Sequence, residues 1–137
     1  MRDLLDTSVW VEFLRGTDSP ASRYVESRLV AEPATIATTE VIAMELLAGA
    51  SGDDALAHVE RLVDSLTLVR VVPALDFPAA AALHRRARRQ GRTVRHLNDC
   101  LIAAIALRTG SVVVHRDADF EVLAATSGLQ TRSFVDP

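Results

Sequence analysis

One stretch of the sequence, residues 98–120, reads NDCLIAAIALRTGSVVVHRDADF and predicts a helix, a tight stop and a strand. The apolar run at 101–107 favours a buried helix, and Gly110 is the residue type that most often follows a helix end. Residues 111–114 then have the β-branched character of a strand. Acids stand at the start of this predicted helix and just past the strand: Asp99, Asp117 and Asp119.

The rest of the chain repeats this alternation of short strands and helices. Apolar stretches predict further strands at 4–5, 35–37 and 68–72, with an edge strand at 129–135. Caps and helical periodicity predict helices at 9–15, 19–31, 40–48, 51–66 with its cap and 76–90, and a last helix after residue 120 that runs to about 126. Such alternation is typical of an α/β fold in which helices cover both faces of a parallel sheet.

Composition bounds the class of protein. The chain has 137 residues and 49% hydrophobic content, which fits a single domain, 1–137, with a substantial core. A single cysteine, Cys100, excludes a disulfide within the chain. The longest apolar run, 101–107, is far shorter than the ~20 residues that span a bilayer, and the N-terminal acids do not suit a secretory signal. We therefore expect a soluble cytoplasmic protein with no membrane partner.

The charged residues are informative in their type. The formal net charge of −3 argues against a general nucleic-acid binder, and all 15 basic residues are arginine. A P-loop protein or a kinase needs a lysine that contacts phosphate. The sequence has no lysine, which argues against both classes.

Four acids are predicted to meet at one edge of the sheet. Asp6 and Asp117 each follow a strand, and Asp99 opens a helix too apolar to face water. Glu45 stands in the apolar stripe of its own helix, where an uncompensated carboxylate is disfavoured. Such oxygen ligands suit Mg²⁺ or Mn²⁺, which can activate a water for phosphodiester hydrolysis.

Each acid also has a purely structural interpretation. Asp6 and Asp117 are competent N-caps, and Asp99 would interact favourably with a helix dipole. Glu45 would be satisfied by a buried arginine. The coincidence of all four at one predicted edge favours the metal site.

Four segments carry a resemblance to a known family: LLDTSVW at 4–10, IAMELLAG at 42–49, NDCLIAAIA at 98–106 and RDADF at 116–120. They resemble the acidic motifs of PIN-domain ribonucleases and, more narrowly, of the VapC toxins of type II toxin–antitoxin pairs. The resemblance covers essentially the whole chain, with the motifs in order and at normal spacing.

The resemblance implies a PIN-like (Rossmann-like) three-layer α/β/α sandwich and Mg²⁺- or Mn²⁺-dependent endoribonuclease activity, with tRNA the expected substrate. It implies inhibition by a cognate VapB antitoxin, a homodimer and a toxin–antitoxin hetero-oligomer. Its catalytic acids would be Asp6, Glu45, Asp99 and Asp117, with Asp6, Asp99 and Asp117 as metal ligands. Auxiliary roles would fall to Asp119, Thr7 and Ser8.

His115 is a departure from the family, which often has Thr or Ser at that position. Two roles are open: contact with the substrate or a leaving group, and a strand-end histidine bonded to nearby backbone, which we favour.

A run of arginines without any acid precedes Asp99, between residues 84 and 96. Arginine suits bidentate phosphate contact, so we expect this arm to bind RNA, chiefly through Arg88, Arg92 and Arg95. A solvated helix face is the alternative for its first half. Two rival functions remain open: a non-catalytic RNA- or protein-binding PIN module, and a phosphatase built around Asp117 and Asp119.

Overall fold

The computed structural model describes all 137 residues, which form one five-stranded sheet and seven α-helices. The strands are β1 (Asp3–Leu5), β2 (Ile36–Thr38), β3 (Thr67–Leu68), β4 (Val112–His115) and β5 (Thr131–Ser133). The helices are α1 (Thr7–Leu14), α2 (Pro20–Ala31), α3 (Glu40–Ala48), α4 (Asp53–Ser65), α5 (Pro73–Arg89), α6 (Leu97–Thr109) and α7 (Ala118–Thr126). A 3₁₀ turn, η1 (Pro33–Thr35), leads into β2. The predicted alternation of strands and helices is confirmed.

All strand pairs in the sheet are parallel, and the strand order is β3-β2-β1-β4-β5. Leu4 of β1 lies opposite Ala37 on one side and Val113 on the other, so β1 is the central strand. The chain builds the sheet outward from β1 in one direction and later returns to its other side at β4. The carboxyl ends of β1 and β4 therefore flank the topological switch point, where open α/β sheets hold their ligands.

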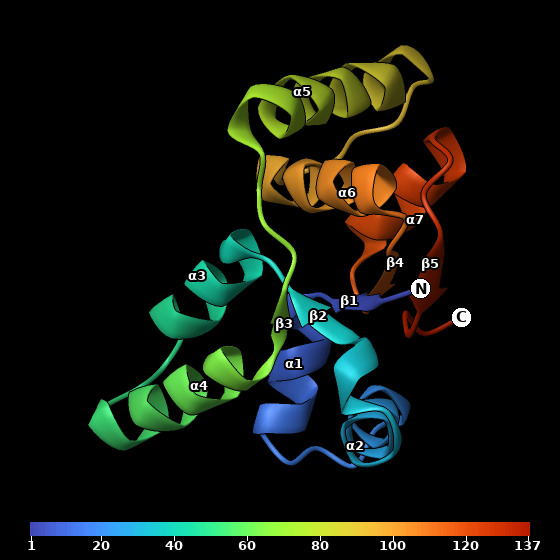
Figure 1. The fold of residues 1–137 in the computed structure, drawn as a ribbon. Helices are drawn as coiled ribbons and strands as arrows, with labels where there is room; N and C mark the ends of the chain where they lie inside the picture. Colours follow the sequence, from blue (N-terminus) through green and yellow to red (C-terminus); the bar gives the residue numbers. More distant parts are fainter.

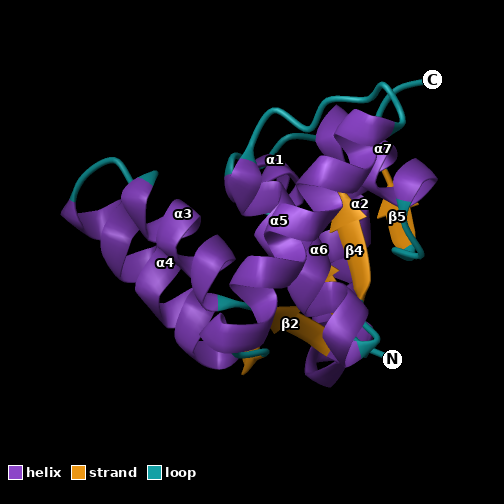
Figure 2. Ribbon diagram, turned by 90° about the horizontal axis from the view of Figure 1, so that it is seen from above, coloured by secondary structure: helices purple, strands orange, loops and turns teal.

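Helices cover both faces of the sheet, as the sequence predicts. Figure 1 shows α5, α6 and α7 on one face and α1 and α2 on the other. The pair α3 and α4 extends sideways from this body, which is plainest when the molecule is seen from above in Figure 2. The fold is thus a three-layer α/β/α sandwich with a lateral helical hairpin.

Helix α6 is the buried centre of the molecule. Its residues from Asp99 to Ala106 are all buried, which confirms the interpretation of the apolar run as a central helix. The helix ends where Gly110 adopts a left-handed φ of 67°, a conformation that glycine takes without steric cost. None of the helices, α6 included, combines the length and the apolar character that crossing a membrane requires.

The predicted strand at 68–72 is mostly wrong, because regular pairing ends at Leu68. One further ladder-like bond joins the Val69 N–H to the Thr38 carbonyl at 2.7 Å. Beyond it, side chains satisfy the backbone: the Val71 N–H donates to Glu40 Oε1 at 2.9 Å, and the Arg70 carbonyl accepts from Arg108 at 2.8 Å. Because side chains satisfy the backbone of residues 70–71, this segment stays extended without pairing to a neighbouring strand, and its β-branched residues do not lengthen β3.

Helix α5 begins earlier than the predicted start at 76, and Pro78 lies inside it. Pro73 occupies the first turn, where a missing N–H costs nothing. Asp76 does not cap the helix as an Asp ahead of a helix would. Instead it accepts a bond from the Val72 N–H at 2.7 Å, one turn back.

The Asp76 side chain, almost fully buried, is clamped by Arg108 of α6. Two parallel bonds join them, from Nε to Oδ1 at 2.8 Å and from Nη2 to Oδ2 at 2.9 Å. This bidentate pair holds the pKa of Asp76 below its usual value. It fixes α5, which carries the arginine arm, against α6, which carries Asp99.

We expect Arg108→Gln to lower the free energy of unfolding by about 2 to 4 kcal/mol, because the buried Asp76 carboxylate loses its charged partner. Arg85→Gln changes an exposed arginine of α5 and should cost less than about 0.5 kcal/mol. Urea denaturation of both variants measures the difference. Equal losses would show that the clamp does not hold the two helices together.

Candidate active site

A cleft of about 610 Å³ opens at the carboxyl edge of the sheet, between the ends of β1 and β4. All four predicted acids line it. The complete lining is Asp6, Thr7, Ser8, Glu45, Arg95, His96, Leu97, Asn98, Asp99 and Asp117. The structure thus brings together residues that lie up to 111 positions apart in the chain, from Asp6 to Asp117.

Asp6 both caps a helix and faces the cleft. Its Oδ2 accepts bonds from the Ser8 N–H at 3.1 Å and from Ser8 Oγ at 2.6 Å. Burial raises the pKa of Asp6, while the bonds from Ser8 oppose the shift. The same Ser8 hydroxyl accepts a bond from the Arg116 N–H at 2.9 Å. Ser8 therefore joins the ends of β1 and β4, because its hydroxyl donates to Asp6 and accepts from Arg116.

Glu45 reaches the cleft from α3. Thr7 Oγ1 donates to its Oε1 at 2.9 Å, and no arginine pairs with it, so the buried-arginine alternative is wrong. Burial raises the pKa of Glu45, and the bond from Thr7 partly offsets this. The carboxylate that the sequence left without a partner is held by a neutral hydroxyl group.

Asp99 is the most perturbed acid of the site. Its side chain is buried in the first turn of α6, and its Oδ2 has no hydrogen-bond donor. Burial, then repulsion from Asp6, and then a shared hydrogen bond with Asp119 raise the pKa of Asp99 to about 9. The pKa of Asp99 is raised this far because no cation lies beside its carboxyl group to stabilise the charged form.

Asp117 follows β4 and, like Asp6, has two roles. As the N-cap of α7, its Oδ1 accepts a bond from the Asp119 N–H at 2.9 Å. Arg95 Nη2 approaches the same oxygen at 3.4 Å. Both N-cap interpretations of these aspartates are therefore correct, and both acids still line the cleft.

Asp119 is a buried fifth acid, only 2% exposed. Its Oδ1 accepts from Arg95 Nε at 3.2 Å, and its Oδ2 lies 3.1 Å from His96 Nδ1. Burial alone would raise the pKa of Asp119, but hydrogen bonds from Arg95 and with the Asp99 carboxyl lower it. The pKa values of these two neighbouring carboxyl groups are thus shifted in opposite directions, that of Asp99 upward and that of Asp119 downward.

Candidate ligand atoms of four residues lie within 4.8 Å of one another: His96, Asp99, Asp117 and Asp119. Asp6 and Glu45 line the same cleft but fall outside this tight group. His96 is a site residue that the sequence motifs do not single out. A signal was present, since His96 stands three residues before Asp99 across the start of a helix, a spacing that places two side chains on one face.

The cluster fits a divalent cation by the chemistry of its donors. Three carboxylates crowd together, and the buried Asp99 Oδ2 has no donor, although oxygens of that kind normally have one. The only arginine that reaches them is Arg95, which binds the Oδ1 atoms of Asp117 and Asp119. The oxygen that points into the cluster from Asp99 is left for a cation.

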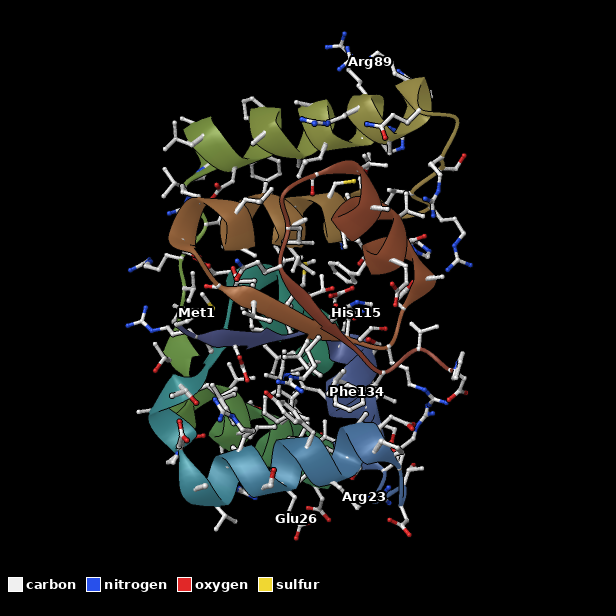
Figure 3. The ribbon with its side chains drawn as sticks, turned by 90° about the vertical axis from the view of Figure 1, so that its right-hand side faces the viewer. Met1, Arg23, Glu26, Arg89, His115 and Phe134 are labelled. Atoms are coloured by element: carbon white, nitrogen blue, oxygen red, sulfur yellow. The ribbon has the colours of Figure 1, made fainter.

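His115 lies behind the site and not in the cleft. Its side chain is fully buried, and Figure 3 shows it in the middle of the molecule. Its Nδ1 accepts a bond from the Asp117 N–H at 3.2 Å, and its ring lies 5.2 Å from that of Phe120. Burial lowers the pKa of His115, so it is a neutral ring that shapes the loop before α7. This placement agrees with the backbone-bonded role favoured for it.

The arginine arm divides into two parts. Arg88, near the end of α5, and Arg92, in the following loop, are exposed and form no ion pair. Arg95 lines the cleft and binds its acids. The side chain of Arg89 extends outward from the end of α5 in Figure 3, away from the body of the molecule. The arm thus has two exposed arginines without an acidic partner and one arginine in the cleft.

The fold and the acidic site define a class of protein. A family profile described as the PIN domain matches residues 4–125, and the chain belongs to this family. The VapBC complex of Salmonella typhimurium, solved bound to DNA, has the same fold, with a TM-score of 0.79 over 97% of this chain and 98% of that chain at 19% identity.

Sequence relatives narrow the class. Ribonuclease VapC11 of Mycobacterium tuberculosis (strain ATCC 25618 / H37Rv) is 53% identical over 131 residues, which cover 96% of this chain and 98% of that protein. Ribonuclease VapC51 of the same strain is 31% identical over 130 residues, 93% of this chain and 89% of that protein. Within the PIN-domain family, the chain is a member of the VapC group, which confirms the resemblance seen in the motifs.

In EDTA, the free energy of unfolding should decrease as the pH rises. Between pH 3.8 and about 9, Asp99 keeps in the folded chain a proton that the unfolded chain has lost, so stability is lost through this window. Asp99→Asn removes the titrating group, and should raise the melting temperature at pH 8 by about 3 to 6 °C and flatten the profile. Thermal unfolding from pH 5 to pH 8 tests this, and parallel profiles for the two proteins would contradict it.

Proposed function

We propose that this chain is a VapC-type toxin that cuts RNA internally by metal-dependent hydrolysis. The observation that carries the proposal is the buried Asp99 Oδ2, without a donor, among carboxylates at the switch point of the sheet. Burying a carboxyl oxygen without a hydrogen-bond donor costs free energy, and perturbed acids of this kind cluster at functional sites. A bound cation would supply the partner that the oxygen lacks. The ribonuclease names of VapC11 and VapC51 support the same function.

Asp99 and Asp117, with Asp6, which lines the same cleft, would hold Mg²⁺ or Mn²⁺. When bound, the cation would neutralise the carboxylates and act as a Lewis acid toward a phosphodiester and the attacking water. Ser8 keeps Asp6 in place through two bonds to its Oδ2. The helix caps at Asp6 and Asp117 fix both side chains before any substrate arrives.

Glu45 is suited to take a proton from water. Thr7 occupies only its Oε1, and the carboxylate lines the cleft. Its raised pKa increases its basicity as a carboxylate, which favours general base catalysis near neutral pH. The role differs from that of the tight cluster, from which Glu45 stands apart.

RNA would reach the acids along the arginine arm. A protein of net charge −3 repels a polyanion over most of its surface, so local positive charge must position the substrate. Arg92 and Arg88 have no acidic partners and are free to contact phosphates. We propose a structured RNA such as tRNA as the substrate class.

A VapB-type antitoxin is the proposed protein partner, as in the VapBC complexes of the same fold. A groove of about 550 Å³ lies between α1, α3 and α4, and its apolar lining includes Val11, Leu14 and Leu46. Glu45 lines both this groove and the acidic cleft. An antitoxin segment seated in the groove would therefore border the site, in a toxin homodimer and a larger toxin–antitoxin assembly.

Asp99→Asn should abolish RNA cleavage while leaving the fold intact, because the site loses its most central oxygen donor. Excess EDTA should abolish the activity of the unchanged protein, and Asp64→Asn, an exposed change on α4, should keep it. Cleavage of a labelled tRNA by nuclease-free preparations measures all three. Full activity of Asp99→Asn would refute the mechanism, and RNA binding without any cleavage would favour the non-catalytic module.

Replacing Arg88 and Arg92 together with Gln should weaken RNA binding about 10-fold at moderate salt, and should reduce the salt slope by about 0.7 to 0.9 for each phosphate that the arm no longer neutralises. The measurement is filter binding in the Asp99→Asn background, so that no cleavage occurs. Arg61→Gln, an exposed change on α4, serves as the matched control. An unchanged salt slope would show that the arm is only a solvated helix face.

A further inference from the structure

We propose that His96, through its Nδ1, joins Asp99, Asp117 and Asp119 as a ligand of the catalytic cation. The site would then be a mixed nitrogen and oxygen site that favours Mn²⁺ over Mg²⁺. The inference deepens the proposed function and rests on its metal dependence.

The distances around His96 suit a shared cation. Its Nδ1 lies 3.1 Å from Asp119 Oδ2 and 3.8 Å from Asp99 Oδ2. The second distance is too long for a hydrogen bond. Two ligands that each bind one cation at about 2.1 Å lie about 3.0 Å apart when adjacent and about 4.2 Å apart when opposite. Both observed distances fall in this range.

An independent observation marks the same place. Asp99 Oδ2, the oxygen that faces His96 Nδ1, is buried and has no hydrogen-bond donor. The histidine does not satisfy it directly, and Arg95 does not reach it. A cation between the ring nitrogen and this oxygen would give the buried oxygen the partner that the protein alone does not supply.

The fold holds His96 in a suitable position. It is the N-cap residue of α6, but its side chain makes no capping bond, and its carbonyl accepts from the Asp99 N–H at 3.1 Å. The ring turns toward Asp119, whose other oxygen, Oδ1, is already occupied by Arg95. The side chain is 63% exposed, so it stands at the mouth of the cleft above two buried acids.

The chemistry of the donor decides which cation gains. A carboxylate-only site suits Mg²⁺, which binds oxygen at fixed octahedral geometry. Imidazole nitrogen adds affinity for first-row transition ions. Mn²⁺ gains the least affinity among these ions, and Mg²⁺ gains less than Mn²⁺. The competing interpretation is that His96 only orients Asp119 by a hydrogen bond, as second-layer groups often orient a ligating carboxylate.

The test uses the full chain titrated with Mn²⁺ and read by pulsed electron paramagnetic resonance. We expect a ¹⁴N coupling from a directly bound imidazole, which changes to a ¹⁵N pattern when the histidines are ¹⁵N-labelled. His96→Gln should abolish the coupling and weaken Mn²⁺ binding about 10-fold, with a change of less than about 3-fold for Mg²⁺. His58→Gln, an exposed histidine on α4, should change neither.

Two outcomes would overturn the inference: Mn²⁺ bound without nitrogen coupling, or a coupling that persists in His96→Gln. The first would leave the proposed function intact, since carboxylates alone would then hold the cation. Absence of any Mn²⁺ or Mg²⁺ binding would refute both. His96→Asn and the label exchange in the unchanged chain provide the answer if the Gln variant does not fold.

Discussion

The burial of the Asp99 carboxyl is the constraint on which the rest of the site depends. A helix that is apolar on every side must lie inside the molecule, and its first-turn acid goes inside with it. Removal from water disfavours the charged form, and the nearby Asp6 carboxylate adds repulsion. Neighbouring groups offset this cost only in part, because Arg95 compensates Asp117 and Asp119 but not Asp99.

The arrangement persists because the surrounding acids are held by ordinary secondary structure. Asp6 and Asp117 cap the helices that follow two adjacent strands, so each carboxylate is oriented by backbone N–H groups. The Ser8 hydroxyl then joins the two loops by accepting from Arg116. The neutral ring of His115 supports the loop before Asp117 from behind. The hydrogen bonds that cap these helices are therefore the same bonds that orient the carboxylates of the site. This explains why residues whose local role is to cap a helix converge on one cleft.

Local sequence was enough for the fold and for the four acids, because both depend on patterns that neighbouring residues display. Strand ends, helix caps and the apolar run of α6 are visible in short windows. The strand predicted at 68–72 is shorter in the structure because Glu40 and Arg108, both distant in sequence, bond to its backbone. His96 joins the cluster for a similar reason: its partner Asp119 is 23 residues away, and only the packing of α6 beside α7 brings them together.

The acidic cleft and the arginine arm have opposite charges, and their placement keeps either from cancelling the function of the other. An acidic cleft repels the phosphates it must cut, and an arginine arm that merely neutralised it would block the cation. Arg95 resolves the conflict by binding only the Oδ1 atoms of Asp117 and Asp119, so the Oδ2 atoms of Asp99 and Asp119 still face the cluster. Arg88 and Arg92, which have no acid to bind, keep their charge for the approach. The absence of lysine fits this division, since a planar guanidinium can hold two carboxylates from one side, whereas an ammonium is a point charge.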